Sequence, residues 1–63
     1  MYILGDVHGS NRKAFDALEG TFGSQEFSAV EAVVALQNIL GVNEEDATRL
    51  VKELVRSGTI KEV

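Results

Sequence analysis

The chain has 63 residues, of which 44% are hydrophobic and 25% are charged, and it carries a formal net charge of −4. It has no cysteine, which excludes disulfides and thiolate metal sites. The negative charge disfavours non-specific binding to nucleic acid or an anionic membrane, and no apolar run approaches the roughly 20 residues that span a bilayer. With no signal peptide visible, we expect one small soluble domain over residues 1–63, in the cytoplasm and without a membrane partner.

A short strand is the first predicted element, because residues 1–4 form an apolar segment that Gly5 ends. A helix should follow, with Ser10 or Asn11 as its N-cap residue. Its apolar positions have helical spacing: Ala14, Phe15, Leu18 and Phe22. Residues 23–25, Gly-Ser-Gln, predict a connector after this helix.

A second helix is predicted from Ser28 to about Leu40. Ser28 and Glu31 have the spacing of a capping box, in which each side chain binds the backbone N–H group of the other residue. Gly41 follows and supplies the C-terminal stop. The apolar residues of this helix lie on nearly every side: Ala29, Val30, Ala32, Val33, Val34, Ala35, Leu36, Ile39 and Leu40. A helix of this kind is either central in the core or covered by a partner.

The third predicted helix begins at Asn43 and ends before Gly58. Its first turn is acidic, which suits the positive end of the helix dipole. One apolar stripe follows at spacings of three and four: Ala47, Leu50, Val51, Leu54 and Val55. The opposite face carries charged residues: Arg49, Lys52, Glu53 and Arg56. This pattern predicts an amphipathic helix with one face in the core.

The final segment, residues 59–63, alternates enough to be a half-buried strand. Two short strands are marginal alone, so we expect residues 2–4 and 59–63 to pair with each other or with another chain. The sequence therefore predicts an α+β, mostly helical domain: three helices between short N- and C-terminal strands, in the order β-α-α-α-β.

Residues 5–9 read Gly-Asp-Val-His-Gly, which places Asp6 and His8 close together at the end of the first strand. With their flanks, residues 1–19, they resemble the opening of calcineurin-like metallophosphoesterases, where a strand, a Gly-Asp-x-His-Gly turn and a helix occur in this order. The resemblance implies that Asp6 and His8 are metal ligands. The cofactor it implies is a divalent ion such as Mn²⁺ or Zn²⁺, which would activate water.

The later ligand motifs of this family, Gly-Asp-x-x-Asp-Arg-Gly and Gly-Asn-His, do not occur in the sequence. A dinuclear centre needs those further ligands, so we expect no enzymatic activity, no catalytic residue and no cofactor. The alternative to metal binding is local, because Asp6 and Gly9 are ordinary turn residues that can shape the passage from strand to helix.

The second half of the chain, residues 32–63, resembles the second half of a winged helix-turn-helix domain. The resemblance rests on the apolar helix, on Leu-Gly-Val at 40–42, on the acidic turn and on a set of later positions. These positions are Ala47, Leu50, Leu54, Gly58 and Ile60. The resemblance implies a winged-helix-like architecture.

Nucleic-acid binding is the alternative function that this second resemblance implies. The basic residues that would contact the nucleic acid are Arg49, Lys52, Arg56 and Lys61. Residues 43–46 read Asn-Glu-Glu-Asp, and they stand where such a domain presents its DNA-contacting side chains. Three carboxylates at that position would repel phosphates, so the charge disfavours this reading.

The apolar surplus of the second helix favours a different function. A small domain has few elements with which to cover a helix that is apolar nearly all round, so part of its surface should face a partner. We expect this interface at Val30, Val33 and Val34. The sequence thus predicts a small non-enzymatic interaction module that associates with itself as a homodimer, or with another protein.

Overall fold

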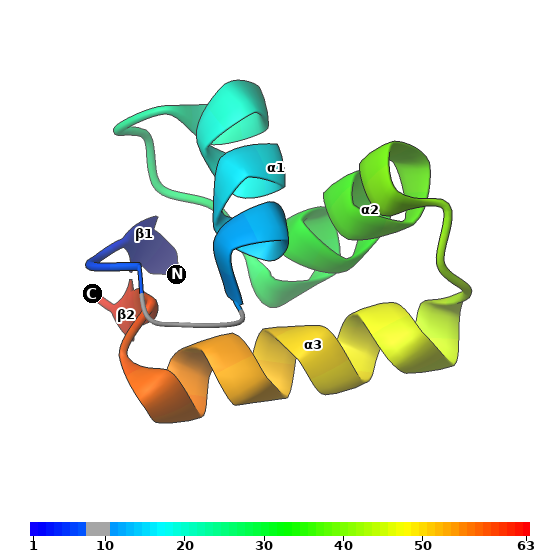
Figure 1. Cartoon of the computed structure of the whole chain (residues 1–63). Helices are drawn as coiled ribbons and strands as arrows, with labels where there is room; N and C mark the ends of the chain where they lie inside the picture. Colours follow the sequence, from blue (N-terminus) through cyan, green and yellow to red (C-terminus); the bar gives the residue numbers. More distant parts are fainter. Residues whose placement is uncertain (8–10) are drawn as a thin grey trace.

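A computed structural model describes residues 1–7 and 11–63 of the chain. The elements follow in the order β1 (Tyr2–Leu4), α1 (Arg12–Phe22), α2 (Ala29–Leu40), α3 (Glu44–Ser57) and β2 (Ile60–Glu62). Figure 1 shows α1 and α2 above α3, with both strands beside the end at which α3 finishes. The predicted β-α-α-α-β order of a mostly helical α+β fold is confirmed.

The two strands pair within the chain and run antiparallel, with Ile3 opposite Lys61 at the centre of the pair. On its other side β1 is joined to the segment between α1 and α2, because Tyr2 and Phe27 exchange two backbone hydrogen bonds of 2.7 and 2.9 Å. The N-terminal strand therefore lies between Phe27 and β2. Beyond the strand ends, the Val63 N–H group donates to the Met1 carbonyl at 3.0 Å.

The boundaries of α2 follow from contacts within a few residues of each end. Both halves of the predicted capping box form: the Glu31 N–H group donates to Ser28 Oγ at 3.1 Å, and the Ser28 N–H group donates to Glu31 Oε1 at 2.8 Å. Gly41 ends the helix with a φ of 71°, in the left-handed region that favours glycine. The predicted start and stop of this helix are confirmed.

The third helix is bounded in the same way. The Asp46 N–H group donates to Asn43 Oδ1 at 2.8 Å, and Gly58 adopts a φ of 82° after the last turn. Asn43 therefore caps α3 as predicted. Only three residues, 41–43, connect α2 to α3 and redirect the backbone between them.

The start of α1 differs from the expectation. Asn11 occupies the N-cap position, but its side chain makes no capping hydrogen bond. Its Nδ2 atom donates instead to Ser57 Oγ at 3.0 Å, and Ser57 Oγ lies 2.9 Å from the hydroxyl of the fully buried Thr59. Asn11 thus holds the predicted N-cap position, but its amide joins α1 to the end of α3 and does not accept a backbone N–H group of α1. Ser10, the other predicted cap, lies outside the described residues.

The core collects side chains from all three helices and from Phe27 and Ile60. Its buried hydrophobic members are Ala14, Ala17, Leu18, Phe27, Ala32, Ala35, Leu36, Ala47, Val51, Leu54 and Ile60. Phe27 has no exposed surface, and its ring stacks on that of Phe22 with the centroids 4.6 Å apart. An aromatic residue outside any helix therefore fills the space between α1, α2 and β1.

The buried face of α3 is narrower than the predicted stripe of five residues. Ala47, Val51 and Leu54 are buried, whereas Leu50 is only partly covered and Val55 is 39% exposed. The expectation that Val55 belongs to the core is wrong, because this side chain lies on the flank of α3 and lines a surface groove beside α2.

Candidate functional site

The outer surface of α2 is almost free of charge. Glu31 is the single charged residue among its 12, and one of the Glu31 carboxylate oxygens already accepts the Ser28 N–H group. The neighbouring α3 contrasts with it, since its 14 residues include Glu44, Glu45, Asp46, Arg49, Lys52, Glu53 and Arg56. An uncharged helix surface on a chain with 25% charged residues resembles the central part of a protein interface, from which charged residues are depleted.

Two valines stand out from this surface. Val30 is 72% exposed and Val34 is 47% exposed, and their spacing of four residues places them on one side of α2. We call this pair the valine ridge. Val33, the third predicted interface residue, is half-buried and packs against the core. Ile39 is 53% exposed but lies near the end of α2, next to residues of α1.

Hollows of the surface lie on both sides of the valine ridge. The hollow toward α3, here called the α2–α3 groove, has a volume of about 360 Å³. Its lining comes from three elements: Tyr2, Ala29, Val33, Thr48, Val51, Lys52 and Val55. The hollow toward α1 has about 320 Å³, and Phe22, Glu31 and both ridge valines contribute to it. A ridge with a groove at its side is a shape into which another helix can pack.

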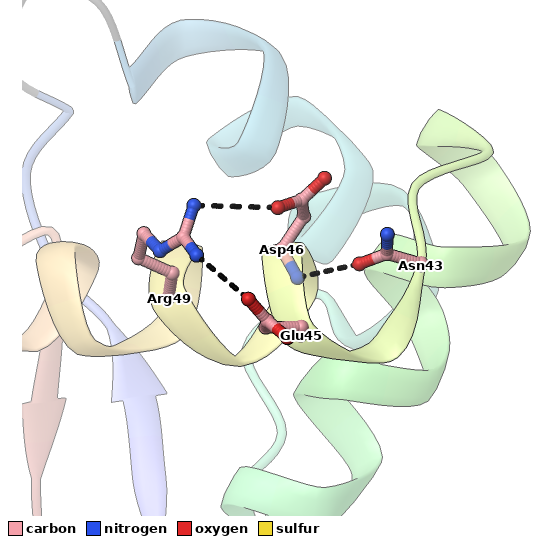
Figure 2. Close-up of polar contacts among 4 residues, drawn as sticks. All are labelled: Asn43, Glu45, Asp46 and Arg49. Carbon is pink, nitrogen blue, oxygen red and sulfur yellow. Dashed lines mark hydrogen bonds and ion pairs between the residues drawn. The ribbon is translucent and has the colours of Figure 1, made fainter.

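The basic residues predicted for nucleic-acid binding are partly neutralised. Figure 2 shows the Arg49 guanidinium directed at the first turn of α3, where it lies 3.1 Å from Glu45 and 3.3 Å from Asp46. Arg56 pairs with Glu53 at 2.9 Å. These three acidic residues are interleaved with the arginines on the exposed side of α3. The arginines therefore do not form an uninterrupted positive face.

The two lysines of that set lie apart from the arginine pairs. Lys52 lines the α2–α3 groove, and no carboxylate within the described residues lies within ion-pair distance of it. Lys61 is in β2, with its aliphatic carbons against Gly5. The four basic residues therefore do not form one surface: the two arginines are ion-paired on α3, Lys52 lines the groove and Lys61 lies in β2.

Gly5, the first residue of the Gly-Asp-Val-His-Gly segment, has a packing role in this structure. A Cβ atom on Gly5 would lie 2.8 Å from the Gly58 carbonyl oxygen, closer than real Cβ contacts come. The Gly5 N–H group also donates to the Thr59 carbonyl at 2.7 Å. The close approach of β1 to the end of α3 therefore requires glycine here, whatever the rest of the segment does.

Of the two predicted metal ligands, the structure describes only Asp6. Asp6 is exposed after β1, and His8 lies outside the described residues. Across the part of the chain that the structure describes, His, Cys, Asp and Glu side chains nowhere gather in groups of three or more that could hold a metal ion. Binding of a divalent metal by Asp6 and His8 stays a prediction.

Comparison with known proteins gives no relative: no protein-family model matches the chain, and no curated protein or solved structure matches it. Within residues 1–7 and 11–63, none of the helices has both the length and the apolar content to cross a membrane.

The sequence predicts that the valine ridge faces outward, but it does not reveal the groove beside the ridge. Tyr2, Thr48 and Val51 line the groove from β1 and α3, and the fold alone brings them beside Ala29 and Val33 of α2. Val55 was the one sequence indication of the groove, since it stands at the margin of the apolar stripe of α3. A residue at the edge of such a stripe is the one to face a groove.

Proposed function

We propose that this chain is a non-enzymatic interaction module that associates with a second copy of itself through the outer surface of α2. The observation that carries the proposal is the valine ridge, two exposed apolar side chains on a helix whose single charged residue, Glu31, stands in its first turn. Covering an exposed valine gains roughly 1.5–3 kcal/mol when burial is complete, so contact between two such ridges is favourable.

A second copy is the partner that suits this surface best. The face has no cluster of charges that would select a highly charged ligand, and a two-fold axis places the same patch on both subunits. The chain also lies in the size range in which a single core gives limited stability and self-association adds to it. Self-association would therefore serve the fold as well as the function.

The expected affinity is modest. The chain exposes 3953 Å² in total, so a standard interface of roughly 800 Å² per partner would occupy about a fifth of its surface. The proposed contact is built on two valines, whereas an interface of standard size has roughly 20–30 residues on each side. We therefore expect a dissociation constant in the range of about 10 μM to 1 mM, because interfaces below the standard size are weak.

The experiment is sedimentation equilibrium of the purified chain over this concentration range, at low and high salt. Two copies that each carry a net charge of −4 repel each other, so salt should strengthen association. Val34→Lys should abolish association and leave the helical circular-dichroism spectrum unchanged. Ile39→Lys is the matched control, because it places the same charge on an exposed apolar residue of α2 away from the ridge.

Two outcomes would contradict the proposal. One is a wild-type chain that stays monomeric at about 1 mM, where even the weakest affinity expected for this interface would leave about half of the chains dimeric. The other is an equal loss of association in Val34→Lys and Ile39→Lys, which would indicate non-specific contact.

The alternative, a winged-helix-like domain that binds nucleic acid, predicts the opposite response to salt. Affinity for duplex DNA through Arg49, Lys52, Arg56 and Lys61 would fall steeply as salt rises, because counterions compete for the phosphates. The ion pairs of Arg49 and Arg56 with Glu45, Asp46 and Glu53 weigh against this alternative. A titration with duplex DNA at low salt, with no binding expected, separates the two.

A further inference from the structure

We infer that the valine ridge of each copy seats in the α2–α3 groove of the other, with Lys52 of each copy facing Glu31 of its partner. This inference rests on the proposed self-association and specifies its geometry. It starts from the fact that the ridge and the groove share a helix: Val30 and Val34 form the ridge, and Ala29 and Val33 form one wall of the groove.

The shape of the face favours this arrangement over contact between the two ridges alone. A ridge placed directly on its symmetry mate would leave both α2–α3 grooves empty, whereas protein interfaces pack as densely as protein interiors. A sideways displacement lets each ridge fill the other groove, which is the ridge-into-groove packing that helices adopt. Because residue i of one copy then meets residue j of the other and the reverse, one two-fold axis satisfies both contacts.

The displacement also determines which flanks meet. When α2 of one copy enters the groove of the other, its groove side faces the partner's α2 and its opposite flank faces the partner's α3. Glu31 lies on that opposite flank, where it lines the hollow toward α1 together with the ridge valines. Lys52 stands on the α3 wall of the groove. The two side chains therefore approach each other across the interface.

The charges complete the match. Arg49 and Arg56, the other cations of α3, have carboxylates of the same helix within 3.3 Å, but Lys52 has none within ion-pair distance among the described residues. Glu31 accepts a backbone hydrogen bond and has no cation within that distance in the same part of the chain. Two symmetric Lys52–Glu31 contacts would offset part of the repulsion between two negatively charged chains.

The test is a charge-reversal experiment, in which association is measured by sedimentation equilibrium at low salt. Lys52→Glu places two carboxylates in contact at each of two symmetric sites, so association should weaken by about tenfold or more. Lys13→Glu is the matched control, because it changes the net charge by the same amount at an exposed lysine of α1. The control should weaken association by less than about threefold, since charges far from the interface are screened.

A mixing experiment makes the test specific. Glu31→Lys alone should also weaken association, whereas an equimolar mixture of Lys52→Glu and Glu31→Lys chains should associate about as well as the wild type, because each contact then joins opposite charges. Since Glu31→Lys removes half of the α2 capping box, Glu31→Gln, which keeps an acceptor for the Ser28 N–H group, checks that the loss comes from charge.

The outcomes separate the geometry from the proposed function. If Lys52→Glu weakens association no more than Lys13→Glu does, or if the mixture does not recover, the ridge-in-groove geometry is wrong. The self-association proposal still stands in that case, provided Val34→Lys abolishes the dimer. A monomeric wild-type chain would overturn both.

Discussion

The two helices α2 and α3 are built alike on the inside and differently on the outside. Each starts at a side chain that accepts a backbone N–H group three residues on, and each stops at a left-handed glycine. Each buries a small set of apolar residues: Ala32, Ala35 and Leu36 in α2, and Ala47, Val51 and Leu54 in α3. The outer side of α3 carries alternating charges, whereas that of α2 carries valines. The fold determines the inner faces and leaves the outer faces open to function.

The largest expected effect tests the similarity of the inner faces. Leu36 and Leu54 both have no exposed surface, so Leu36→Ala and Leu54→Ala should each lower the free energy of unfolding by about 2–5 kcal/mol. A loss of that size approaches the whole stability of a domain this small, so both variants should be largely unfolded at 25 °C. Urea titration followed by circular dichroism, at a concentration below that of self-association, measures the loss. A mild effect of Leu36→Ala alone would show that α2 contributes less to the core than α3 does.

An intermediate effect tests how the ends of the two helices differ. Gly5 covers the Gly58 carbonyl after α3, whereas a Cβ on Gly41 after α2 would meet nothing within 4 Å. Gly5→Ala should therefore cost about 1–3 kcal/mol, because the backbone oxygen must move. Gly20→Ala is the control, at an open position inside α1, and should raise stability by about 0.5–1 kcal/mol. Two shifts of the same sign in thermal unfolding would contradict the packing role of Gly5.

The smallest expected effect tests whether the two caps are equivalent. Ser28→Ala and Asn43→Ala each remove one acceptor for a backbone N–H group, so each should cost about 1 kcal/mol. Ser24→Ala, in the exposed turn after α1, should change stability by less than about 0.5 kcal/mol. Chemical denaturation of the three variants side by side provides the measurement. A cap that can be removed without cost would mean that tertiary packing alone holds its helix.

Most of the features that the sequence predicted correctly are set by near neighbours. The capping box of Ser28 and Glu31 spans four residues, and so the start of α2 could be read without knowing anything about the rest of the fold. The exposure of the valine ridge followed from the excess of apolar residues around α2, since one small domain cannot cover every side of an apolar helix. The pairing of β1 with β2 is the long-range exception: the marginal stability of short strands predicted a partner for each, either the other strand or another chain, and the structure has the first.

The features that the sequence did not reveal depend on contacts far apart in the chain. Asn11 has the residue type of a cap, but its amide finds Ser57, 46 residues away, and only the assembled fold decides between the two roles. Phe27 belongs to no helix or strand and so had no periodicity to place it in the core. Its position before the N-cap Ser28 was an unused signal, because a hydrophobic residue there commonly packs against the first turns of the helix.

The hydrogen bond from Val63 to Met1 means that the two ends of the chain meet, so the backbone traces an almost closed circuit. A short turn joining these residues would complete a hairpin without moving either strand, and a new break in the exposed turn at 23–26 would keep every contact of the core. The entropy lost on pairing the two strands would also change. In the natural order β1 and β2 lie at opposite ends of the sequence and must meet by closing the longest loop that the chain can form. In the circularly permuted chain a short turn replaces that loop, so we expect folding to be faster although the native structure is the same.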